Sequence, residues 1–172
     1  MHKAGMPEAV DRFEEQAFDF VTGPRARAAF DINSEDPKVR ERYGRNSWAQ
    51  STLLARRLVE AGSTFVTCHF GGWDHHWNLK SGMENNLPRI DQLVSALFTD
   101  LCERGLYEKV LVVLCGEFSR TPRMNDGGNG GPPGSMGTPG RDHWGNAMFC
   151  LMWGGGVKGG QIVGATNPKG TA

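Results

Sequence analysis

The sequence feature that most limits the fold is an unbroken apolar run at residues 110–115, which follows a long helical pattern. The run reads Val-Leu-Val-Val-Leu-Cys and has the length of one β-strand. A strand with one face in water alternates apolar and polar residues, so an unbroken run indicates a strand that is covered on both faces. Such strands are typical of sheets with helices on both sides. The run therefore predicts an α/β fold with a mostly parallel sheet.

The rest of the chain supplies helices and strands that fit this prediction. Helices are indicated by apolar residues at three- and four-residue steps, and strands by short apolar or β-branched runs. Alternation of helices and strands favours a parallel or mixed sheet. The predicted helices are residues 7–22, 37–43, 47–62 and 84–103, and the further predicted strands are residues 63–70, 147–153 and 161–165.

Composition gives no indication of a nucleic-acid or membrane partner. The chain has 19 basic and 19 acidic side chains and no basic stripe with interleaved aromatic residues. No apolar run is long enough to cross a bilayer, and residues 1–10 contain no apolar signal region. We treat the chain as one domain or part of one, residues 1–172, with a flexible Gly- and Pro-rich loop at residues 125–140.

The four cysteines form no Cys-x-x-Cys pair. Three of them lie in apolar runs and one lies in a helical pattern. We therefore expect buried free thiols that behave as small apolar side chains. They are Cys68, Cys102, Cys115 and Cys150.

Three polar clusters flank the predicted buried strands, two of them at carboxyl ends, where α/β sheets bind ligands. Their carboxylates and imidazoles are donors that suit zinc, manganese or iron. A metal site needs ligands from several strand ends, so the three clusters together favour such a site. The clusters are Asp74, His75 and His76; Glu117 and Arg120; and Asp142 and His143.

Each cluster alone also has a purely structural interpretation. The first could decorate a polar loop, and Glu117 could form an ion pair with Arg120 or Arg123. Asp142 could either orient His143 as a ligand or simply anchor the loop with it. Arg120 is also the best candidate for holding an anionic substrate, because a guanidinium binds phosphate or sulfate through two parallel hydrogen bonds. The sequence contains neither a phosphate-binding P-loop nor a Gly-x-Ser-x-Gly elbow.

The sequence of these clusters and of other segments resembles the domain of unknown function 1501 family of bacteria, over nearly the whole chain. The segments that carry the resemblance are residues 30–31, 40–44, 54–62, 72–74 with His76 and Asn78, 116–118 with 120–122, 140–144, 154–156 and 164–166.

This family is placed in the alkaline-phosphatase-like clan. The resemblance therefore implies an alkaline-phosphatase-like α/β fold, with a mostly parallel sheet flanked by helices, and a metal-dependent hydrolase of phosphate or sulfate esters. Asp74, His76 and His143 would bind one divalent metal, zinc first and manganese, iron or calcium as alternatives. Glu117 would help to bind a second metal, although Phe118 stands where a further ligand His is expected. Asn78 matches the residue that follows the first ligands in the clan, and His75 is an extra donor.

The resemblance also implies what the chain would need for catalysis. The clan's Ser or Thr nucleophile lies near the N-terminus, in a region that no part of this sequence resembles. We therefore expect a C-terminal portion of such a domain, whose partner is a small anionic ester and whose location is periplasmic or exported. The alternative is a non-catalytic metal-binding or structural remnant.

Overall fold

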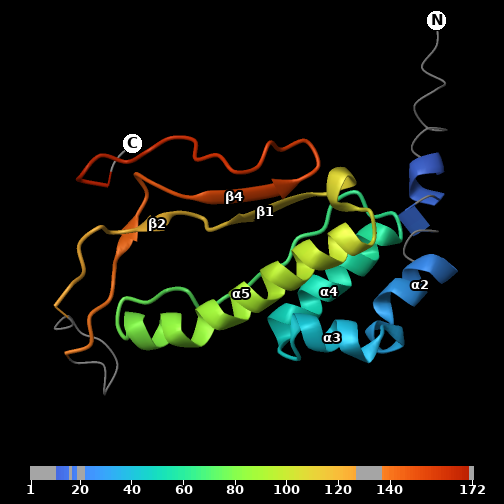
Figure 1. The fold of residues 1–172 in the computed structure, drawn as a ribbon, viewed down its shortest axis with the longest axis horizontal. Helices are drawn as coiled ribbons and strands as arrows, with labels where there is room; N and C mark the ends of the chain where they lie inside the picture. The colour runs from blue at the N-terminus through green and yellow to red at the C-terminus, as the bar shows by residue number, and fades with distance from the viewer. Residues whose placement is uncertain (1–10, 16, 19–21, 127–136, 171–172) are drawn as a thin grey trace, which may run out of the picture. The chain divides into compact units, whose positions relative to one another are not determined.

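The computed structural model describes residues 11–15, 17–18, 22–126 and 137–170 (Figure 1). The chain divides into two compact units, Met1–His69 and Phe70–Ala172. Much of the predicted helix at residues 7–22 and of the loop at residues 125–140 lies outside the described residues.

The first unit is helical. It contains α2 (Pro24–Phe30), the 3-10 turn η1 (Ile32–Ser34), α3 (Pro37–Tyr43) and α4 (Ser47–Glu60), and both α2 and α3 pack against α4. A proline opens both α2 and α3, where its fixed φ and missing N–H cost nothing. Helix α4 begins where the Asn46 side chain accepts a hydrogen bond from the N–H of Ala49 (3.1 Å).

A buried ion network holds the first unit together. The Glu35 carboxylate accepts hydrogen bonds from Arg56 (2.5 Å) and Arg57 (2.8 Å), and the Arg56 side chain is only 1% exposed. Arg57 also donates to the carbonyls of Ala28 (2.5 Å) and Ala29 (2.9 Å) near the end of α2. These carbonyls have no partner within their own helix, so α4 supplies the donors that α2 lacks.

The long predicted helix is present in the second unit as α5 (Leu79–Glu103). Gly105 ends it with a φ of 64°, a left-handed conformation that favours glycine. The N–H of Leu106 then reaches the Leu101 carbonyl (2.9 Å), which satisfies one of the free carbonyls at the helix end. Helix α5 begins directly after residues 71–78, so it fixes where the segment that carries the first polar cluster ends.

The strands form two small antiparallel sheets and, among the described residues, no parallel sheet. One sheet pairs β1 (Leu111–Cys115) with β4 (Cys150–Gly154), and the other pairs β2 (Ser119–Arg120) with β3 (His143–Trp144). The predicted mixture of helices and strands is confirmed, whereas parallel pairing is not seen. The residues described between β1 and β4 contain no helix, and a parallel pair needs a long crossover that is usually helical.

Other strand and burial predictions also need correction. Residues 63–70 are assigned to no strand although they were predicted to form one, and residues 161–165 are exposed and unpaired in any sheet. Strand β1 is not covered on both faces, because Leu111 and Val113 are 52% and 47% exposed. Three of the cysteines predicted to be buried are exposed, although all four are free thiols.

No helix among the described residues has the length and apolar character needed to cross a membrane.

Candidate metal centre

The centre of the candidate site is one carboxylate oxygen, Oδ1 of Asp74. It lies 2.8 Å from Nε2 of His143, 3.1 Å from Nδ1 of His76 and 2.6 Å from a terminal nitrogen of Arg120. The three potential ligand atoms of Asp74, His76 and His143 all lie within 4.8 Å of one another. Four residues from the three predicted polar clusters therefore meet at a single point: Asp74 and His76 from the first cluster, Arg120 from the second and His143 from the third.

Pairing of β2 with β3 places two of these residues side by side. Arg120 and His143 are directly opposite each other in this antiparallel register. Opposite residues project from the same face of a sheet, so both side chains reach Asp74 from one side. Although the two strands are only two residues long, their pairing joins parts of the chain that are 23 positions apart.

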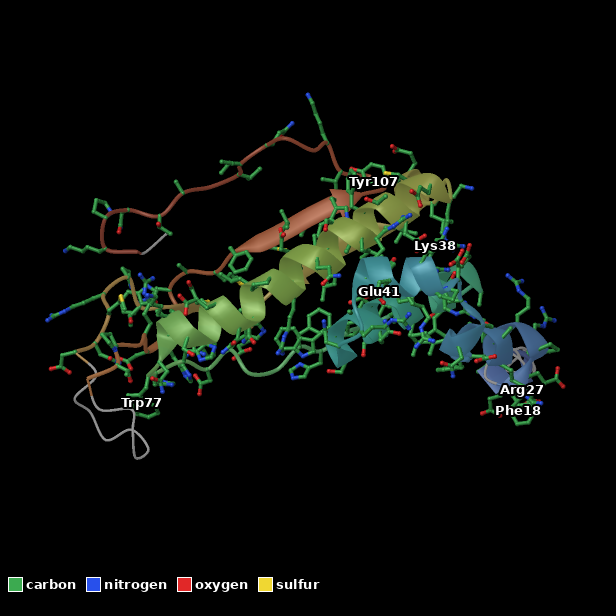
Figure 2. All side chains as sticks on the ribbon, turned by 60° about the horizontal axis from the view of Figure 1, so that its bottom comes forward. Phe18, Arg27, Lys38, Glu41, Trp77 and Tyr107 are labelled. Carbon is green, nitrogen blue, oxygen red and sulfur yellow. The ribbon has the colours of Figure 1, made fainter. Side chains whose placement is uncertain are left out.

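The loop that carries Asp74 and His76 is held by hydrogen bonds to its backbone. Asn86 of α5 donates to the Gly72 carbonyl (3.0 Å), and Asn125 donates to the His76 carbonyl (3.0 Å). The N–H of Arg141 donates to the His75 carbonyl (3.0 Å). Trp77, labelled in Figure 2, marks the end of α5 at which this loop lies, and Tyr107 marks the other end. The loop is therefore attached both to α5 and to the segments next to β2 and β3.

Two glycines allow close approach at the site. A Cβ on Gly140 would lie 2.1 Å from the carbonyl oxygen of His76, so only glycine fits there without displacing the loop. A Cβ on Gly82, in the first turn of α5, would lie 2.2 Å from the imidazole of His75. The sequence offered no sign of these contacts, because each glycine lies in a stretch that reads as an ordinary loop or helix.

Two rings contact His143. Its imidazole lies near the rings of His76 (centroids 4.8 Å apart) and Phe118 (4.7 Å), and the Arg120 guanidinium lies 5.9 Å from the Phe118 ring centre. Phe118 thus contributes an apolar wall at the position where the resemblance would place another ligand His. This wall limits the orientations that His143 and Arg120 can adopt.

The electrostatic environment keeps Asp74 ionised. Hydrogen bonds to His143 and Arg120, with the nearby Arg120 charge, lower the pKa of Asp74 to about 2. The Asp74 side chain is 63% exposed, so water screens these interactions and leaves the carboxylate open to an incoming cation. Asp74 is therefore a ready anionic ligand at every pH at which the chain would normally be studied.

The other predicted site residues lie outside this group. Glu117 is exposed and, among the described residues, pairs with neither Arg120 nor Arg123, so its ligand role stays a prediction. Asp142 uses its backbone to pair with Thr121, while Asp74 is the acidic partner of His143. Asn78 adopts a left-handed conformation (φ 52°) at the start of α5, and His75 is half-buried beside Gly82.

The donor set fits a divalent transition metal. Four ligands around zinc at about 2.1 Å lie about 3.4 Å from one another. The two contacts to Asp74, at 2.8 and 3.1 Å, would widen slightly around an ion, and all three donor atoms lie within 4.8 Å of one another. One carboxylate and two imidazoles are also the donor types that catalytic zinc sites use with an open fourth position. Arg120 opposes a cation, because its positive charge lies against the same oxygen.

Comparison with known families decides the relationship of the chain. Residues 3–172 match the family described as "Protein of unknown function (DUF1501)". The chain belongs to this family. The match covers the loop at residues 71–78, both small sheets and α5. The whole Asp74 cluster, which consists of Asp74, His76, Arg120 and His143, therefore lies within the DUF1501 domain. Neither the curated proteins nor the solved structures contain a significant match to this DUF1501 chain.

Proposed function

We propose that this DUF1501 chain binds a divalent metal, zinc first, through Asp74, His76 and His143, and serves as the metal- and anion-binding part of a phosphate or sulfate ester hydrolase. The observation that carries the proposal is the convergence of two imidazole nitrogens on Oδ1 of Asp74, with Arg120 at the same atom. Manganese, iron and calcium are the alternative metals.

Arg120 supports an anionic substrate. Its guanidinium is mostly buried, with a side chain that is 22% exposed, and a second nitrogen donates to the Trp73 carbonyl (3.3 Å). The side chain is therefore held in place next to the cluster instead of extending into water. When a cation shares the Asp74 carboxylate, the same guanidinium is positioned to donate to oxygens of a phosphate or sulfate group.

The division of roles follows from the chemistry of each group. A bound metal would polarise an ester oxygen and stabilise the negative charge that develops on it. Asp74, His76 and His143 would hold the ion, Arg120 would orient the anionic group, and Phe118 would exclude water from one side of His143. By the clan resemblance, the attacking group would be a Ser or Thr from a region that no part of this sequence resembles.

The second candidate is a metal-binding module without hydrolytic activity. It is favoured by the Asp74–Arg120 ion pair, because an Arg120 that stays engaged with Asp74 is not free to hold an anionic substrate. Both candidates require the metal, and they differ only in turnover.

The test is elemental analysis of the purified chain, followed by activity assays. We expect about one metal per chain, lost in an Asp74→Ala, His143→Ala double variant and kept in a His69→Ala control, since His69 is exposed and lies in the other unit. A folded chain that binds no added zinc or manganese would refute the site. Metal binding without hydrolysis of chromogenic phosphate or sulfate esters would favour the second candidate.

A further inference from the structure

Two of the cysteines face each other across the β1–β4 sheet. Cys115 ends β1, Cys150 begins β4, and the antiparallel register pairs them directly. Both are exposed free thiols. No sequence pattern connects them, because they are 35 positions apart and lie in separate apolar runs.

The ladder hydrogen bonds determine which kind of pair the cysteines form. The N–H of Gly155 donates to the Val110 carbonyl (3.0 Å), so these two residues form a hydrogen-bonded pair at the end of the ladder. Hydrogen-bonded and non-hydrogen-bonded pairs alternate along an antiparallel ladder. Five steps along the register, Cys115 and Cys150 therefore form a non-hydrogen-bonded pair.

This geometry suits a covalent bond between the two sulfurs. Cα atoms in a non-hydrogen-bonded pair lie about 4.5 Å apart and their side chains project from the same face. Disulfides span Cα separations from about 4.4 to 6.8 Å, so no movement of the backbone is required. The neighbouring pair on this face, Val113 and Met152, is 47% and 49% exposed, so the face is open to a reagent.

We infer that Cys115 and Cys150 are a redox-active pair that closes a cross-strand disulfide with a low-molecular-weight disulfide such as glutathione disulfide as the oxidant. One cysteine sulfur attacks a glutathione sulfur, forms a mixed disulfide and releases the first glutathione. The second cysteine then attacks the protein sulfur of that mixed disulfide and releases the second glutathione. Two protein thiols are oxidised, one glutathione disulfide is reduced, and the two thiol protons end on the two glutathiones.

The disulfide would enclose in a covalent loop the chain segment that carries two of the four residues of the Asp74 cluster. Residues 116–149 lie between the two cysteines and include Arg120 on β2 and His143 on β3. Oxidation would tie both ends of this segment to one point of the β1–β4 sheet. The inference itself rests on the strand register and does not depend on metal binding.

The test is disulfide mapping of the full chain after equilibration with reduced and oxidised glutathione. Trypsin separates all four cysteines, placing Cys115 in residues 110–120 and Cys150 in residues 142–158. We expect these two peptides to be joined in the native chain, while Cys68 and Cys102 carry at most single glutathiones. In urea the preference should change to Cys102–Cys115, because the shorter loop closes more readily in an unfolded chain.

Thermal unfolding provides the second readout. Oxidation should raise Tm by about 10 °C, from the loop-closure entropy of a disulfide with this spacing. The Cys115→Ser and Cys150→Ser single variants should show no such rise, whereas a Cys68→Ser, Cys102→Ser double variant should retain it. Separate mixed glutathione disulfides on Cys115 and Cys150, or thiols that stay free at an oxidant level that oxidises unfolded chain, would overturn the inference.

Discussion

Replacement of Arg120 by methionine should strengthen metal binding although it removes a residue of the site. The guanidinium lies 2.6 Å from the Asp74 oxygen that a metal would need, so it competes with the metal and repels it. Methionine keeps much of the side-chain length without the charge. The pKa of Asp74 should also rise, since the Arg120 hydrogen bond and charge are among the causes of its low value.

The magnitude follows from the exposure of the site. A divalent ion about 4.5 Å from a unit positive charge is repelled by about 2 kcal/mol in a water-like dielectric. Salt screening lowers this to about 1.4 kcal/mol, which corresponds to a tenfold change in affinity. We therefore expect Arg120→Met to bind zinc about tenfold more tightly and phosphate more weakly.

The assay is competition for zinc against a chromophoric chelator, with isothermal titration of phosphate into the zinc-loaded chain. Arg123→Met is the matched control, because Arg123 is an exposed cation three residues after Arg120 and is not among the partners of the Asp74 carboxylate. The zinc effect should shrink in high salt. If Arg120→Met weakened zinc binding, or if Arg123→Met had an equal effect, Arg120 would not be the competing charge.

Three further outcomes follow from the described contacts. Gly140→Ala should weaken zinc binding at least tenfold, because its Cβ would meet the His76 carbonyl at 2.1 Å, whereas Gly145→Ala, with open space around it, should not. The folded-state pKa of Asp74, about 2, lies below its unfolded value of about 3.9. The stability advantage over Asp74→Asn should therefore be constant above about pH 5 and disappear between about pH 4 and pH 2 in acid unfolding, with a size under about 1 kcal/mol; a constant difference down to pH 2 would contradict it. Glu35→Gln should cost about 3 kcal/mol in urea unfolding because Arg56 is 1% exposed, while the exposed Glu41→Gln should cost under about 0.5 kcal/mol; equal losses would refute the buried network.

The helices could be predicted because their signals are local. Apolar residues at helical spacing identified α5, and Gly105 marked its end. The helix starts five residues before the predicted residue 84. This first part includes Gly82, a residue of low helix propensity, so the local pattern gave no sign of it. That glycine is accounted for by the imidazole of His75 next to it, a contact that no spacing rule contains.

The direction of strand pairing could not be predicted in the same way. The apolar character of a strand indicates that it is removed from water, but it does not indicate which strand it pairs with. The residues that meet at Asp74 were identified as candidates from their side-chain types, whereas the residues that hold their loop in place were not. Asn86 and Asn125 hold the loop through backbone carbonyls 14 and 49 positions away, and in the sequence they read as ordinary helix and turn residues.

The β1–β4 ladder has a consequence for amide exchange. Each strand is paired on one side only among the described residues, and residues of non-hydrogen-bonded pairs direct their N–H groups away from the partner strand. The amides of Leu111, Val113 and Cys115 should therefore exchange with deuterium quickly, while those of Val112 and Leu114 are slowed. A peptide segment that docks along β1 as a further strand would protect the fast set and leave the slow set unchanged, so alternate amides of one strand would report separately on folding and on recognition.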